Sequence, residues 1–175
     1  MQEKIYLDQL FEEKGWFMSE NFDVFVPKNR DSIEEEMPSK GNLLSKNISW
    51  LRSEWKKKEK DYFGIIKKFH HAKLLSRYKC HVSRFGPEGK YMRPCMLFIR
   101  LRTKRDKTRV IETIGHELLH LVFSDFLEFK KLGYPEREGM IDALILQSNL
   151  SKLFPRYKKQ SIGKVRQKLL KTILK

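Results

Sequence analysis

The chain has 175 residues, of which 40% are hydrophobic, 12% aromatic and 34% charged. This length suits one ordinary domain, and the composition favours a folded protein over a disordered one. No apolar run approaches the roughly 18 residues that a membrane-spanning helix needs. The first residues show no basic leader followed by an apolar block, so we expect no secretory signal and a cytoplasmic location.

The net charge of +15 is distributed unevenly along the chain. Residues 1–40 hold ten acidic and five basic side chains, a net charge of −5, which leaves a net charge of +20 on residues 41–175. Such a field attracts nucleic acid, an anionic membrane surface or acidic protein, although a lysine-rich solvated surface is the simpler interpretation. The two cysteines, Cys80 and Cys95, lack a CxxC partner, so free thiols are favoured over a zinc knuckle or a disulfide.

Residues 1–42 are predicted to form an acidic N-terminal segment and linker. A short helix is expected over residues 3–14, an alternating strand over 21–27 and a polar linker over 28–42. A long helix follows from Asn47, because apolar residues recur at helical spacing while lysines occupy the other face. Its aromatic residues are expected to face the core, and a grip on a nucleic-acid strand is the alternative.

Strand patterns come next. Residues 74–85 and 91–102 flank the turn residues Gly86-Pro87-Glu88-Gly89, so the two segments are predicted to form a β-hairpin. Residues 96–102 contain the strongest strand pattern of the chain.

Three helices are expected in the second half of the chain. The first covers residues 108–124, and the second runs from Pro135 to Phe154. Residues 161–175 form a basic amphipathic C-terminal helix that we expect to pack on the core, with an anionic membrane surface as the alternative. These elements together predict an α+β fold.

A metal-binding motif lies in the helix expected over residues 108–124. Residues 116–120 read His-Glu-Leu-Leu-His, and helical spacing places His116 and His120 on one face, where both can bind one ion. Zinc accepts such ligands and leaves one position for water, from which Glu117 can take a proton. Two incidental histidines are the alternative, but burying these three side chains without a shared partner is costly.

A catalytic zinc needs a third protein ligand, and no histidine follows His120. Asp125 is a weak candidate because it lies roughly 140° around the helix from His120. The other downstream acids are Glu128, Glu136, Glu138 and Asp142. Glu138 and Asp142 are four residues apart, so one carboxylate can bind zinc while the other accepts the ring N–H of a ligating histidine. The alternative is a helix start with acids at its positive end.

His-Glu-x-x-His followed by Glu-x-x-x-Asp resembles the signature of the gluzincin metallopeptidases. The resemblance covers chiefly residues 96–145 and is similar to the soluble minigluzincins and to the catalytic cores of membrane-embedded CAAX-processing-type peptidases. It implies a compact zincin-like catalytic domain over residues 43–160. The implied parts are a backing helix, a small β-sheet, an active-site helix and a glutamate helix.

The resemblance also implies a role for each site residue. His116, His120 and Glu138 become the ligands of one Zn²⁺ ion, Glu117 the general base and Asp142 the partner of His116. Residues 96–102 become the strand that binds the substrate backbone. The candidates for stabilising the oxyanion are Tyr134, Tyr157 and Arg137. The implied activity is that of an endopeptidase that uses a zinc-bound water on a protein or peptide substrate.

Two alternatives remain open from the sequence. One is a nucleic-acid-associated zinc protein or protease with an SprT-like role, although SprT-like proteases use a histidine as third ligand. The other concerns regulation, because the acidic N-terminal segment or the C-terminal helix could hold the peptidase latent in its cleft. The oligomeric state is not predicted.

Overall fold

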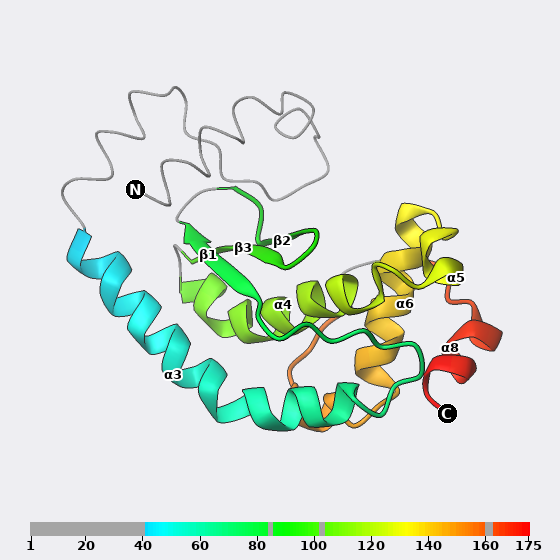
Figure 1. Cartoon of the computed structure of the whole chain (residues 1–175). Coiled ribbons are helices and arrows are strands. Elements are labelled where there is room, and N and C mark those ends of the chain that lie inside the picture. The colour runs from blue at the N-terminus through cyan, green and yellow to red at the C-terminus, as the bar shows by residue number, and fades with distance from the viewer. Residues whose placement is uncertain (1–40, 84–85, 102–103, 160–162) are drawn as a thin grey trace.

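The computed structural model describes residues 41–83, 86–101, 104–159 and 163–175 of the chain. The helix expected over residues 3–14, the strand over 21–27 and nearly all of the linker over 28–42 lie outside these ranges. Within them, six helices and a three-stranded sheet pack together, with the sheet on one side of the molecule (Figure 1). None of the helices in this part of the chain is both long enough and apolar enough to cross a lipid bilayer.

Helix α3 spans Gly41–Ile66 and lies along one side of the molecule (Figure 1). It begins earlier than the predicted start at Asn47, since residues 42–46 contain no proline or glycine that would end a helix. The predicted division of its surface is confirmed. Its core-facing side chains include Leu51, Tyr62 and Ile66, and its exposed lysines include Lys56, Lys57 and Lys60.

The sheet contains β1 (Lys79–Ser83), β2 (Gly89–Met92) and β3 (Met96–Arg100) in the order β1-β3-β2. Strand β1 pairs with β3 in parallel, whereas β2 pairs with β3 in an antiparallel arrangement. The continuous apolar pattern of β3 is typical of a strand that is buried on both faces. Three successive residues of β3, Leu97, Phe98 and Ile99, are buried.

The hairpin predicted between residues 74–85 and 91–102 is therefore wrong. The two segments are neighbours, but β1 and β3 run in the same direction, and the antiparallel pair is β2 with β3. Gly86 has a φ of 84°, and strand β2, which follows it, pairs with the far edge of β3 instead of with β1. Because β3 is paired on both edges, it cannot accept a further strand, and the substrate-binding role expected for residues 96–102 is wrong as well.

The second half of the chain is mostly helical. Helix α4 (Lys104–Phe123) matches the helix expected over 108–124 and begins four residues earlier. It is followed by α5 (Leu127–Lys130), α6 (Tyr134–Leu146), α7 (Leu150–Leu153) and α8 (Gln167–Ile173).

The single helix expected from Pro135 to Phe154 is divided into α6 and α7. Ser148 causes the break, because its hydroxyl accepts a hydrogen bond from the Leu150 backbone N–H and its carbonyl accepts one from Ser151. Such local bonds replace the regular helical pattern.

The C-terminal helix is shorter than the predicted 161–175. Before α8 begins, the backbone at Gly163 passes directly over α6 at Gly139. A Cβ atom at Gly139 would lie 2.7 Å from the Gly163 backbone oxygen, which explains a glycine inside α6. The α8 side chains Leu170 and Ile173 are buried, so the predicted packing of this helix on the core is confirmed.

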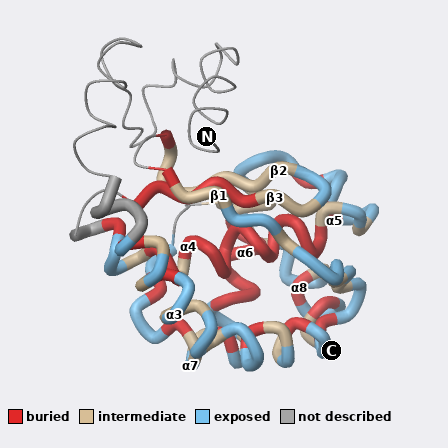
Figure 2. Tube along the Cα trace, turned by 60° about the vertical axis from the view of Figure 1, so that its left-hand side comes forward, coloured by how far each residue is buried: buried red, intermediate tan, exposed pale blue. Residues whose placement is uncertain are grey.

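Helix α4 lies at the centre of the molecule, between the sheet and α6 (Figures 1 and 2). From Val110 to Phe123 every residue except Glu112 is buried, as expected for a helix that is surrounded on all sides. A small mixed sheet packed against helices confirms the predicted α+β class. The central position of α4 also buries the His-Glu-Leu-Leu-His motif.

Candidate metal centre

The two histidines of α4 point to the same place. One helical turn separates them, and their Nε2 atoms lie 3.1 Å apart. Both rings are buried, and their planes meet at 65°. The ring of Tyr91 in β2 stacks on the ring of His120, with 4.6 Å between the two ring centroids. This contact fixes the orientation of the imidazole from the sheet side.

Helix α6 brings Glu138 to the two histidines. One carboxylate oxygen lies 3.0 Å from His116 Nε2, and the other lies 3.1 Å from His120 Nε2. The start of α6 is well defined, because Gly133 is its N-cap, proline occupies its first turn and the Glu136 carboxylate accepts a hydrogen bond from the Gly133 backbone N–H. Together with helix packing, this start sets which residue of α6 faces α4.

The geometry fits a metal ion. One potential ligand atom from each of His116, His120 and Glu138 lies within 4.8 Å of the others. Zinc bound tetrahedrally, with bonds of about 2.0–2.1 Å, keeps two ligand atoms about 3.3 Å apart, close to the separations in this cluster. Two imidazoles and one carboxylate also form the set of three protein ligands typical of catalytic zinc.

The three groups affect one another electrostatically. Burial disfavours the ionised Glu138, but its hydrogen bonds with both histidines hold the pKa of this carboxyl well below its usual value. Burial alone would lower the pKa of His116, whereas the Glu138 hydrogen bond and the nearby carboxylates raise it above the usual value. At His120 burial prevails, and the pKa is lowered.

Glu117 lies next to His116 in a buried position under β2. A Cβ atom at Gly89 would lie 2.8 Å from a Glu117 carboxylate oxygen, so the missing side chain of Gly89 leaves room for this group. Burial raises the pKa of Glu117 to about 7, with the charge of His116 opposing the change and that of Glu138 adding to it. A carboxylate with a pKa in this range can both accept and release a proton near neutral pH.

Asp142 does not contact His116 in the way predicted. Its Oδ1 atom is 3.8 Å from His116 Nδ1, too far for a direct hydrogen bond. The Tyr157 hydroxyl lies between them, 2.7 Å from His116 Nδ1 and 2.6 Å from Asp142 Oδ1. Asp142 therefore reaches the histidine through a tyrosine.

The three candidates for stabilising an oxyanion occupy different places. Tyr157 lies on the Nδ1 side of His116, opposite the side that faces Glu138, so its hydroxyl is not directed toward the ligand cluster. Tyr134 is half-exposed at the start of α6, and its pKa is raised to about 12 by burial and by the charges of Glu138 and Glu117. Arg137 lies near enough to help lower the pKa of His120.

Other predicted or unassigned groups lie outside the cluster. Asp125, the weak ligand candidate, is exposed and forms an ion pair of 2.7 Å with Lys73. Cys80 and Cys95 are free thiols, as expected. Tyr91 was not identified from the sequence, because an isolated tyrosine in a strand carries no pattern that points to a neighbouring helix.

No protein family model matches the chain, and neither does any curated protein or solved structure. Only the chemistry of the residues themselves therefore indicates a function.

Proposed function

We propose that the chain is a zinc-dependent metallopeptidase of the gluzincin type that hydrolyses peptide bonds in protein or peptide substrates. The observation that supports this most directly is the buried convergence of His116, His120 and Glu138 from two helices, with Glu117 beside the first ligand. A structural zinc site needs four protein ligands, and a catalytic one needs three. Three ligands with an adjacent carboxylate favour catalysis.

In the proposed reaction the zinc ion and the protein side chains have separate roles. Bound zinc would polarise the scissile carbonyl and lower the pKa of a water molecule. Glu117 would accept a proton from the water and transfer it to the leaving amine. Tyr134 and Arg137 are the two remaining candidates for a hydrogen bond to the oxyanion, because both belong to the first turns of α6, near Glu138.

The substrate backbone is proposed to bind along β2 instead of residues 96–102. Strand β2 forms an edge of the described sheet, and it contacts α4 at both Glu117 and His120. A peptide added to this edge would pass close to the general base. Backbone hydrogen bonds would supply affinity in this mode, and side-chain pockets would supply preference.

The test is Glu117→Gln with Glu112→Gln as the matched control, since both residues belong to α4 and the chemical change is the same. Casein and a quenched fluorescent peptide mixture serve as substrates, and metal analysis gives the zinc content. Glu117→Gln should retain one zinc per chain and lose cleavage by about 100-fold or more, whereas Glu112→Gln should cleave normally. Full activity in Glu117→Gln would show that Glu117 is not the base.

The third ligand is tested separately. Glu138→Ala should lose stoichiometric zinc, while the exposed Glu128→Ala should keep it. Equal zinc content in the two variants would remove Glu138 from the ligand set, and with it the gluzincin assignment.

An alternative function keeps the zinc site but uses the basic surface to bind nucleic acid. The exposed lysines of α3, among them Lys56, Lys57 and Lys60, support this possibility. Binding of duplex or single-stranded DNA would then fall steeply with salt concentration. Absence of binding at physiological salt would exclude this function.

Latency and a cytoplasmic location complete the proposal. Because Leu170 and Ile173 anchor α8 in the core, the acidic residues 1–40 are the better candidate for an inhibitory segment. Removing them by limited proteolysis should raise casein cleavage if they cover the site. Unchanged cleavage would count against latency.

A further inference from the structure

A chain of two short hydrogen bonds connects the first metal ligand to a buried carboxylate. His116 Nδ1 and the Tyr157 hydroxyl are 2.7 Å apart, and the same hydroxyl donates a hydrogen bond of 2.6 Å to Asp142 Oδ1. All three side chains are buried, with exposed fractions of 1% for His116, 9% for Tyr157 and 1% for Asp142. Water therefore does not compete freely for these groups.

The donors and acceptors in this chain can be assigned. A phenol has one proton to donate, and an ionised carboxylate can only accept. Because Tyr157 gives its proton to Asp142, its oxygen can only accept from His116. His116 must then carry a proton on Nδ1. In the neutral ring this leaves Nε2, which lies 3.0 Å from a Glu138 oxygen, as the nitrogen whose lone pair can bind a metal.

We propose that Tyr157 is a positioning residue that fixes the Nδ1–H tautomer of His116 and so presents Nε2 to the metal. This inference rests on the proposed zinc function for its purpose but not for its geometry. Metal-binding histidines commonly donate their second ring N–H to a fixed acceptor, which sets both tautomer and ring orientation. In this protein the acceptor is a tyrosine, and Asp142 sets the direction of the tyrosine proton.

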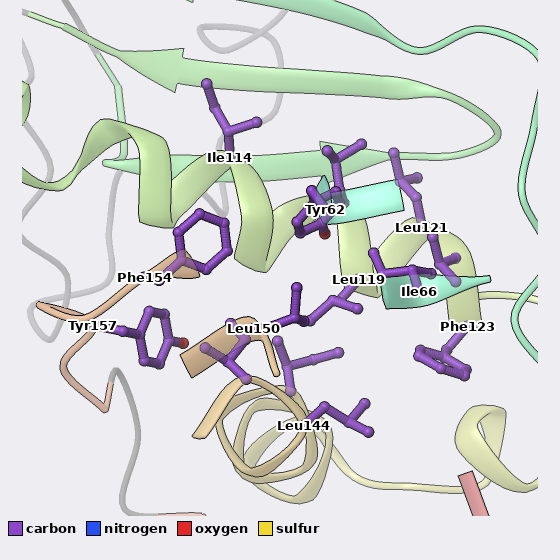
Figure 3. Close-up of a cluster of buried hydrophobic side chains, with 14 of the residues drawn as sticks. Tyr62, Ile66, Ile114, Leu119, Leu121, Phe123, Leu144, Leu150, Phe154 and Tyr157 are labelled. Carbon is purple, nitrogen blue, oxygen red and sulfur yellow. The ribbon is translucent and has the colours of Figure 1, made fainter. Parts of the chain in front are cut away.

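The polypeptide brings Tyr157 next to His116 through a close contact between Phe154 and α4. The ring of Phe154 packs against Gly115, where an added Cβ atom would lie only 2.6 Å from the ring. The Tyr157 backbone N–H then donates to the Phe154 carbonyl, a turn that carries the Tyr157 side chain toward His116. Figure 3 shows both rings at the same end of the buried cluster.

A second contact holds α4 at the same point. The Tyr62 hydroxyl of α3 donates to the Gly115 carbonyl at 2.5 Å, so the residue before His116 is also held by a hydrogen bond. Gly115 therefore serves two purposes: it admits Phe154 and it exposes its carbonyl to Tyr62. Both contacts keep His116 at a constant distance from Tyr157.

The second histidine has no comparable partner on Nδ1. His120 Nδ1 is buried and has no hydrogen-bond partner among the described residues. Its Nε2 atom lies 3.1 Å from the Glu138 carboxylate, and its ring is stacked on Tyr91, so nothing on the Nδ1 side acts on its tautomer. Of the two histidines, only His116 thus has a hydrogen-bond partner on Nδ1 among the described residues, and loss of Tyr157 should affect His116 selectively.

The experiment compares Tyr157→Phe with wild type in the full chain. Long-range nitrogen–proton NMR correlations, recorded without metal at a pH above the titration of both histidines, report the tautomer of His116. Wild type should show the Nδ1–H form, and Tyr157→Phe should show a mixture. Zinc affinity, measured by competition with a chelator, should weaken by about 10- to 100-fold in the variant.

Tyr78→Phe is the control for loss of a phenol hydroxyl, because the Tyr78 hydroxyl accepts one hydrogen bond, from the Leu75 backbone N–H, and lies away from the site. Asp142→Asn is a second variant in case Tyr157→Phe does not fold. An amide can donate to the Tyr157 oxygen and release the phenol proton toward His116 Nδ1, so this variant should shift His116 toward the Nε2–H form.

Two results would overturn the proposal. One is a wild-type His116 protonated on Nε2 alone, and the other is a folded Tyr157→Phe with wild-type tautomer and zinc affinity. The tautomer is measured without metal, so a chain that binds no zinc would contradict the proposed function and still decide the role of Tyr157.

Discussion

Replacing Gly139 with alanine is expected to destabilise the protein, although this substitution normally stabilises a helix. Inside a helix, alanine is favoured over glycine by about 1 kcal/mol. At Gly139, the added Cβ atom would lie 2.7 Å from the backbone oxygen of Gly163 and 2.8 Å from its carbonyl carbon. Backbone atoms cannot rotate away as a side chain can, so the C-terminal segment must move off α6.

Overpacking of this kind typically costs about 1–3 kcal/mol. Subtracting the gain in helix propensity leaves an expected net loss of about 1 kcal/mol for Gly139→Ala. Because Glu138 is the adjacent residue, zinc affinity should also decrease. Urea denaturation followed by circular dichroism measures the loss of stability, and chelator competition measures the zinc affinity.

Gly64 in α3 provides the control. An added Cβ atom at Gly64 would meet nothing within 4 Å, so Gly64→Ala should stabilise the protein by about 1 kcal/mol. The two variants should therefore differ by about 2 kcal/mol and in sign. If Gly139→Ala were as stabilising as Gly64→Ala, the two backbones would not cross closely in solution.

Three further predictions concern the site and its support. Burial raises the pKa of Glu117 from 4.5 to about 7, so the folded protein retains a proton there that the unfolded chain has lost, and stability falls as the pH rises through this range. The free energy of unfolding of metal-free Glu117→Gln should accordingly exceed that of wild type by up to about 3 kcal/mol above pH 7 and by little near about pH 4. Urea denaturation at the two pH values tests this. If the variant and wild type were equally stable at both, the charge of Glu117 would not be buried. Ile173→Ala should lower the free energy of unfolding by about 2–4 kcal/mol, measured by thermal unfolding, because Ile173 is fully buried. Replacement of the exposed Lys171 with alanine should change this free energy little. Similar losses in the two variants would mean that α8 is not packed on the core. Zinc affinity should fall from about pH 8 to 6 with release of protons, since the pKa of His116 is raised and its proton competes with the metal; calorimetry in two buffers that shows no proton release would argue against imidazole ligands.

Helical spacing was enough to predict that the two histidines of α4 lie close together. His116 and His120 are one turn apart, and any helix that contains them places both on one face. The same local rule predicted that Glu138 and Asp142 share a face of α6. The apolar and lysine faces of α3 were predictable for the same reason.

The sheet was not predictable from local pattern. The turn residues around Gly86 are typical of a hairpin, but they do not specify which edge of β3 the next strand occupies. That choice depends on the pairing of both edges of the apolar β3, one with β1 and the other with β2. The break between α6 and α7 was also not predicted, because Ser148 interrupts a helix only when its local hydrogen bonds form.

The role of Tyr157 depends entirely on tertiary structure. The residue was identified from the sequence as a candidate for oxyanion stabilisation, yet its hydroxyl lies behind His116. Nothing in the spacing of 41 residues between them indicates a hydrogen bond. It arises because Phe154 packs on Gly115 and turns the chain toward His116.

The amino-acid sequence by itself determined the helices and the residue types that each one presents, because a helix repeats every few residues and its side-chain directions follow from the backbone alone. Only the tertiary structure decided that α6 would bring a carboxylate to within 3.1 Å of both imidazoles, that β2 would lie over Glu117, and that a tyrosine would separate Asp142 from His116. These arrangements depend on the packing of segments distant in sequence, where the volumes and directions of many side chains act together.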